Sequence, residues 1–177
     1  MHSVLIVSTP IHAHIAPLLA VARHLVDSGC RVRFLTGSRY RDTVESTGAR
    51  FLPLPAAADY RDTDFDADFP GRAGLTGPKA ISFDMREIFL KPMPHQLAAI
   101  DAALADESAD AILAESLFFG VLPVLTRPRA ARPAVLNLGI VPLGVASRDT
   151  APFGLGIPPM PGLAGRLRNR LLGFVAT

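Results

Sequence analysis

The chain opens with a short apolar run followed by apolar positions at helical spacing. Residues 4–7 read Val-Leu-Ile-Val, a continuous and largely β-branched run that predicts a strand buried on both faces. A helix is predicted next, and Gly29 ends it. Its apolar face comprises Ile15, Leu18, Leu19, Ala22, Leu25 and Val26. Residues 8–17 therefore form a strand-to-helix turn, the kind of turn at which open α/β sheets bind ligands.

Similar runs recur along the chain and define the expected fold. Strands are predicted at 31–36, 51–54, 111–114 and 133–138, and helices at about 40–47, 80–90, 94–106 and 163–174, with a short helix ending near 126. Right-handed crossovers then put the second and third strands on one side of the first and the fourth on the other. The pattern predicts an α/β fold, a Rossmann-like, doubly wound and mostly parallel sheet, in a single domain at 1–177.

Two segments, 55–79 and 139–161, lack periodicity and are predicted to be long surface loops. The first carries alternating aspartates at 62, 64, 66 and 68, which raises the question of calcium binding. The run lacks the glycine and glutamate that an EF-hand loop requires, so a solvated acidic loop is favoured. The second segment is rich in glycine and proline.

His14 is the first candidate for chemistry. It is expected just ahead of the first helical turn, with Pro17 inside the start of the helix. The positive end of the helix dipole disfavours a second positive charge, so a neutral imidazole is favoured. A neutral imidazole with a free nitrogen can act as a general base near neutral pH. The alternative is a histidine held by backbone groups in a tight turn.

The rest of the turn excludes several ligand classes. His12 is expected to face away from His14, and the two have no third ligand nearby in sequence, so no metal site is expected. The alternative is a His-x-His metal pair in a metal-dependent hydrolase that uses both residues. No glycine occurs between Met1 and Asp27, and no Gly-x-x-x-x-Gly-Lys-Ser/Thr run is present, which excludes a dinucleotide fingerprint and a P-loop. A ligand at this turn is therefore not expected to be held by its phosphates.

A carboxylate, Glu115, follows the run at 111–114. In a doubly wound sheet the carboxyl ends of the first and fourth strands meet at the topological switch point, so His14 and Glu115 both belong there. A carboxylate on one imidazole nitrogen fixes the tautomer and stabilises the imidazolium that forms when the other nitrogen takes a proton. A His–carboxylate dyad is predicted. The alternative for Glu115 is a solvated residue beside a helix N-terminus.

Composition narrows the class of protein. Hydrophobic residues make up 49% and charged residues 19% of the 177, which indicates a globular chain with a core. The net charge of +2, the absence of Trp and the presence of only two Tyr argue against nucleic-acid binding. No apolar run reaches the ~18 residues of a membrane span. A single cysteine, Cys30, and no signal-like start favour a cytoplasmic location.

Residues 10–29 resemble the opening of the family 1, GT-B-fold glycosyltransferases, which include the macrolide glycosyltransferases and the UDP-glucuronosyl/UDP-glucosyltransferase superfamily. The run Pro-Ile-His-Ala-His-Ile-Ala-Pro at 10–17 is similar to the family's Gly-His-Val/Ile-x-Pro turn, with Ala13 in place of Gly. In the family the motif histidine deprotonates the acceptor hydroxyl, and it matches His14. The family aspartate that orients the histidine matches Glu115, one methylene longer, so a dyad requires the backbone or rotamer to compensate.

The resemblance implies the acceptor-binding half of an inverting glycosyltransferase. Such a hexosyltransferase moves a sugar from a nucleotide-activated donor, such as a UDP-sugar, to a hydroxyl of a hydrophobic natural product or lipid, with no cofactor and no catalytic metal. The family's second Rossmann-like domain, which holds the nucleotide sugar, has no match here, so the isolated chain is expected to be inactive. A non-catalytic Rossmann-like module that binds a small molecule is the alternative.

Substrate contacts are expected at the strand ends and on the helix at 80–90, where core packing is the alternative for the apolar residues. The expected substrate-binding residues are His12, Ile15, Met85, Phe89, Ser116, Phe118 and Asn137. Arg166, Arg168 and Arg170 form a basic stripe on the last predicted helix. A solvated face is one interpretation of the stripe, and contact with a glycolipid or membrane surface is the other.

Overall fold

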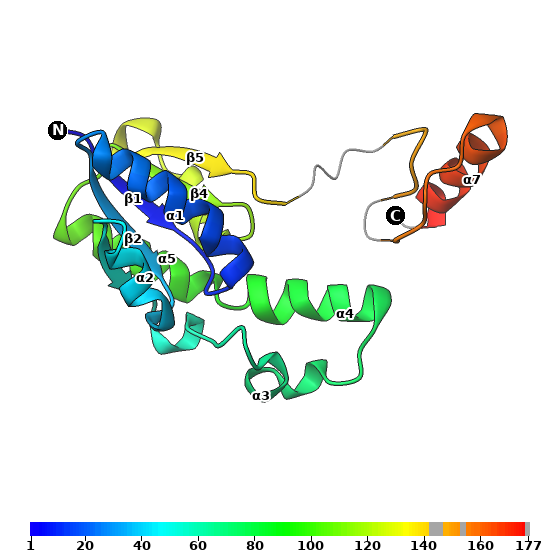
Figure 1. The fold of residues 1–177 in the computed structure, drawn as a ribbon, viewed down its shortest axis with the longest axis horizontal. Coiled ribbons are helices and arrows are strands. Elements are labelled where there is room, and N and C mark those ends of the chain that lie inside the picture. The colour runs from blue at the N-terminus through cyan, green and yellow to red at the C-terminus, as the bar shows by residue number, and fades with distance from the viewer. Residues whose placement is uncertain (142–146, 153–154, 176–177) are drawn as a thin grey trace. The chain divides into compact units, whose positions relative to one another are not determined.

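A parallel five-stranded sheet organises the chain in the computed structural model, which describes residues 1–141, 147–152 and 155–175. The strand order is β3-β2-β1-β4-β5, and every neighbouring pair is parallel (Figure 1). This order confirms the predicted doubly wound α/β fold, with β2 and β3 on one side of β1 and β4 on the other. The strands are β1 (Ser3–Val7), β2 (Arg31–Thr36), β3 (Arg50–Pro53), β4 (Ala111–Glu115) and β5 (Ala134–Leu138).

Helices follow most of the strands. The α-helices are α1 (His12–Asp27), α2 (Arg41–Glu45), α3 (Phe65–Asp68), α4 (Gly77–Phe83), α5 (Met93–Asp106), α6 (Leu122–Leu125) and α7 (Gly162–Val175). A π-helical segment, η4 (Asp84–Leu90), follows α4 directly, so the helix predicted at 80–90 changes its hydrogen-bonding pattern midway. The 3₁₀ turns are η1 (Ser38–Tyr40), η2 (Ala56–Ala58), η3 (Pro70–Arg72), η5 (Phe119–Val121) and η6 (Arg129–Ala131).

Side chains of the central strands alternate between two cores, one on each face of the sheet. In β1, Val4 and Ile6 pack with α1 and α2, while Leu5 and Val7 pack with α5, η5 and α6. Both faces are therefore covered, which explains why the run at 4–7 is apolar at every position. Pro53 lies on the edge strand β3, where its missing N–H leaves no gap in the sheet.

The described residues divide into two compact units. The first comprises 1–74 and 83–140 and contains the whole sheet. The second comprises 75–82 and 141–177. Residues 142–146, 153–154 and 176–177 lie outside the described residues, and the first two of these ranges belong to the predicted loop at 139–161. Within the second unit, Arg166 pairs with Asp149 at 2.7 Å and Arg168 donates to the Pro158 carbonyl at 3.0 Å.

The segment at 55–79 is not the irregular loop that the sequence predicts. It contains η2, α3 and η3, and α4 begins at Gly77. Its aspartates hold this structure together: Asp64 caps α3 by accepting from the Ala67 N–H at 3.2 Å, and Asp68 accepts from Arg61. Short helices of this kind depend on polar side chains that bind orphan N–H groups, which a hydrophobic pattern does not report.

Two buried polar side chains join α5 to the rest of the first unit. Gln96 has no exposed surface, and its Oε1 accepts from the Gly120 N–H at 2.8 Å. Arg33 is 2% exposed and donates to the carbonyls of Ala103 and Ser108, at the C-terminal end of α5. The inward face of α5 therefore includes Gln96 beside Ile100 and Ala103, whereas Leu97 and Leu104 pack at its margin.

Gly120→Ala is expected to destabilise the chain by about 1–3 kcal/mol, the usual cost of overpacking. A Cβ at position 120 would lie 2.9 Å from backbone atoms of Gln96 and Leu97, closer than carbon atoms pack. Urea unfolding of the variant and of Gly139→Ala measures the effect. Position 139 has nothing within 4 Å of an added Cβ, so its variant is the matched control. Equal stability of the two variants would contradict the prediction.

Candidate active site

The turn between β1 and α1 is tightly packed. Ser8 and Thr9 have no exposed surface, and α1 begins at His12. The prediction that His14 precedes the first helical turn is therefore wrong, because His14 is the third residue of α1 and lies within that turn. Ile11 occupies the N-cap position in an extended conformation and provides no side-chain cap. The His12 N–H at the start of α1 is therefore left for water or for a group from elsewhere in the chain.

Asp62 supplies that group. Its carboxylate accepts from the His12 N–H at 2.7 Å, from the Tyr40 hydroxyl at 2.7 Å and from Arg39 at 2.6 Å. Burial alone would raise the pKa of Asp62, but the hydrogen bonds from Tyr40 and His12 and the charge of Arg39 outweigh it and lower the pKa. Asp62 therefore caps α1 as an ionised carboxylate and ties the segment at 55–79 to the turn.

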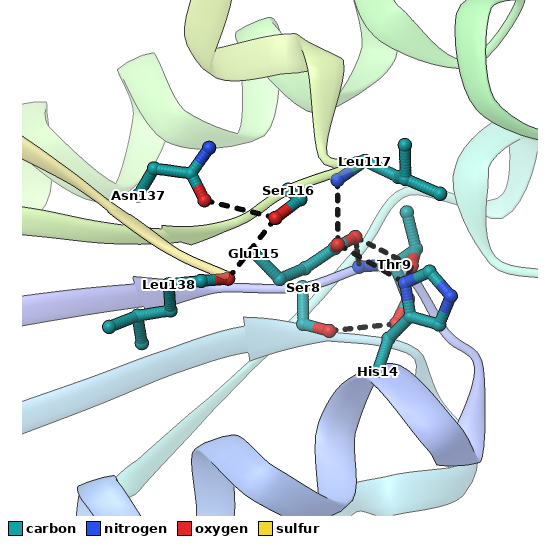
Figure 2. A network of polar contacts seen from close by, with 8 residues as sticks. All are labelled: Ser8, Thr9, His14, Glu115, Ser116, Leu117, Asn137 and Leu138. Atoms are coloured by element: carbon teal, nitrogen blue, oxygen red, sulfur yellow. Dashed lines mark hydrogen bonds and ion pairs between the residues drawn. The ribbon is translucent and has the colours of Figure 1, made fainter. Parts of the chain in front are cut away.

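Glu115 ends β4 next to β1 and is 1% exposed. Four groups contact its carboxylate (Figure 2). Oε1 lies 2.8 Å from the Thr9 hydroxyl and 3.3 Å from the Thr9 N–H, while Oε2 lies 2.7 Å from the Leu117 N–H and 3.1 Å from His14 Nδ1. Backbone N–H groups can only donate, so the carboxylate is held as an acceptor. These hydrogen bonds offset the free-energy cost of removing the carboxylate from water.

The imidazole of His14 is oriented by this carboxylate. Because Glu115 accepts, Nδ1 carries the proton of the 3.1 Å hydrogen bond, so in the neutral form of the ring the lone pair lies on Nε2. Figure 2 shows the second ring nitrogen pointing away from Glu115, and the His14 side chain is 13% exposed. The ring also stacks on Phe89, with centroids 5.8 Å apart and an angle of 20° between the planes. The carboxylate and the Phe89 ring together fix the orientation of the imidazole.

The other predicted site residues differ in their exposure and contacts. His12 is exposed and meets Asp62 through its backbone N–H, and Met85 is partly exposed on η4, four residues before Phe89. Ile15 has no exposed surface and Phe118 is 1% exposed, each within one of the two cores, so neither side chain lines an open surface. Ser116 donates to Oδ1 of the exposed Asn137 at 3.1 Å and to the Leu138 carbonyl at 3.3 Å.

Tyr60 belongs to the site although no sequence pattern indicates it. Burial raises the pKa of its hydroxyl well above the ordinary range, and the negative charge of Glu115 raises it further. Its ring meets Phe69 edge to face at 5.2 Å. Both aromatic residues line a cavity of about 680 Å³ within the first unit. Other residues lining this cavity are Arg39, Arg61, Lys91 and His95.

Within 1–141, 147–152 and 155–175, no three His, Cys, Asp or Glu side chains are grouped so as to hold a metal ion. No helix in those ranges is long and apolar enough to cross a bilayer.

The chain is similar to known proteins over almost its whole length. The chain is 38% identical over 169 residues to 4'-demethylrebeccamycin synthase of Lentzea aerocolonigenes and 36% identical over 172 residues to UDP-glycosyltransferase 2 of Phaeomoniella chlamydospora. These alignments cover 96% and 94% of the chain but only 39% and 38% of the two relatives, so the chain spans less than half of their length. No protein-family model matches the chain.

Solved structures show the same fold at lower identity. The calicheamicin glycosyltransferase CalG4 matches 77% of the chain and 32% of its own length, with a TM-score of 0.56 and 21% identity. UGT2 of Phytolacca americana, solved with UDP-2-fluoro-glucose and pterostilbene, matches 77% of the chain and 30% of its own length, with a TM-score of 0.52 and 19% identity. In sequence and in fold, the chain is therefore similar to a part of several glycosyltransferases.

Asp62→Asn is expected to lower stability near neutral pH but not in acid. Because the folded-state pKa of Asp62 is lowered, its stabilising contribution is complete above the unfolded pKa of about 3.9 and is lost as pH falls through the folded value. Urea unfolding at pH 7 and at about pH 3 measures the difference between wild type and variant. Asp66→Asn, an exposed change in the same segment, is the control. A difference of the same size at both pH values would contradict the prediction.

Proposed function

We propose that the protein to which this chain belongs is an inverting glycosyltransferase in which His14 is the general base. The observation that carries the proposal is the 3.1 Å contact between His14 Nδ1 and a Glu115 carboxylate held by three other donors. This contact leaves Nε2 free to take a proton from an acceptor hydroxyl. The glycosyltransferase relatives support the reaction class, since they match almost the whole chain.

In the proposed reaction the acceptor oxygen attacks the anomeric carbon of a nucleotide-activated hexose. A new carbon–oxygen bond forms as the bond to the nucleotide's phosphate oxygen breaks on the opposite face, which inverts the centre. The hydroxyl proton moves to Nε2 of His14, and the nucleotide leaves with the electron pair of the broken bond. Glu115 stabilises the imidazolium that forms, as in a serine-protease triad. The step requires no metal and no cofactor besides the sugar donor.

The acceptor in this proposal is a hydrophobic small molecule or lipid. Phe89 supports it, because the side chain is largely buried but its ring lies against the imidazole that would receive the proton. Met85, partly exposed on the same segment, adds apolar surface. Aromatic and flexible apolar side chains of this kind line small-molecule sites. The donor would be held by a part of the protein beyond this chain, so the chain alone is expected to be inactive.

His14→Gln in the full-length protein is expected to lower kcat by roughly 10²- to 10⁴-fold, because glutamine offers no basic nitrogen. Transfer from radiolabelled nucleotide sugars to a panel of phenolic, polyketide and lipid alcohols measures the effect. His24→Gln is the matched control, because His24 is an exposed histidine near the other end of α1. A His14→Gln enzyme within twofold of wild type, or full turnover by the 177-residue chain alone, would contradict the proposal.

A further inference from the structure

We propose that Thr9 is the positioning residue of the His14–Glu115 pair and that its hydroxyl allows a glutamate to serve at position 115. The inference rests on the proposed function for its kinetic consequences but not for its geometry. Thr9 follows β1, has no exposed surface and directs both of its donors to one oxygen of Glu115. No sequence motif around Thr9 indicates this role, because its partner Glu115 lies 106 residues away.

The first step concerns the carboxylate. Glutamate has one more rotatable bond than aspartate, so a carboxylate at its end needs more restraint to face a partner in one orientation. The Thr9 hydroxyl at 2.8 Å and the Thr9 N–H at 3.3 Å both occupy Oε1. With Oε1 held there and Oε2 bound by the Leu117 N–H at 2.7 Å, the plane of the carboxylate is fixed and Oε2 faces His14.

The second step concerns the imidazole. The Thr9 Oγ1 lies 3.2 Å from His14 Nδ1, while Glu115 Oε2 lies 3.1 Å from the same nitrogen. The hydroxyl has one proton, which it donates to Glu115, so it meets the Nδ1–H with a lone pair. The Nδ1–H is therefore shared between two acceptors, and Figure 2 shows the three side chains converging. This fork fixes the tautomer and the ring orientation together, and with them the direction of Nε2.

A second threonine supplies a comparison within the same sheet. Thr36 ends β2, the strand beside β1, and has no exposed surface, yet its hydroxyl has no hydrogen-bond partner among the described residues. Burial at a strand end therefore does not by itself produce the contacts of Thr9. Thr36→Val removes a buried hydroxyl of the same kind without touching the pair, which makes it the matched control.

A double-mutant cycle in the full-length protein tests the role. Thr9→Val is expected to lower kcat roughly 10- to 100-fold, a part of the ~10²–10⁴ that a positioned base contributes, with KM within about twofold. Thr9→Ser, which keeps the hydroxyl, is expected to recover most of the loss. In a Glu115→Gln background, Thr9→Val is expected to lower kcat by less than about twofold. Equal losses in both backgrounds, or no recovery with serine, would show a merely structural residue.

A spectroscopic readout separates this inference from the proposed function. In full-length protein labelled with ¹⁵N-histidine, the His14 ring nitrogens report the tautomer, and the resonances are assigned by their loss in His14→Gln. The wild type and Thr36→Val are expected to show one tautomer protonated at Nδ1, whereas Thr9→Val shows a mixture. An unchanged tautomer in Thr9→Val overturns the positioning role even if the enzyme transfers sugar. Absence of transfer by the wild type instead overturns the proposed function and leaves the tautomer result standing.

Discussion

A buried carboxylate at the junction of β1 and β4 is the constraint on which the site depends. An ionised group that loses water must be surrounded by donors, and those of Glu115 come from three places: the end of β1, the first turn of α1 and the turn after β4. The parallel register, which pairs Val7 with Ala114, brings these places together. The arrangement of the strands therefore supplies hydrogen-bond donors to the Glu115 carboxylate, and the carboxylate in turn orients the His14 imidazole.

Local sequence patterns predict the sheet and the pairing of His14 with Glu115 at the carboxyl ends of β1 and β4. Continuous apolar runs mark strands buried on both faces, and the handedness of the crossovers leaves a single order for the first four strands. That order alone brings the ends of β1 and β4 together, so His14 and Glu115 can be assigned as neighbours from the sequence. The extra methylene of glutamate is accommodated because Thr9 and Leu117 offer donors at the right depth.

The features that the sequence does not predict depend on partners far along the chain. Gln96 is a polar residue on the inward face of α5, and its burial is compensated because Gly120, twenty-four residues later, presents its N–H there. The pKa of Tyr60 likewise depends on a group outside its own segment, the charged Glu115. Hydrophobic periodicity reports which face of an element is apolar, whereas a polar partner fifty residues away leaves no local trace.

The cap on α1 has a consequence for the way the chain is made. Asp62 lies fifty residues beyond the helix end that it binds, so His14 is synthesised long before the residue that caps its helix. Until residue 62 emerges, the first turn of α1 has N–H groups that only water can satisfy, and such turns fray. Synthesis therefore divides the βα unit in time: its body can form early, whereas the turn that holds the imidazole is completed only when a later segment arrives.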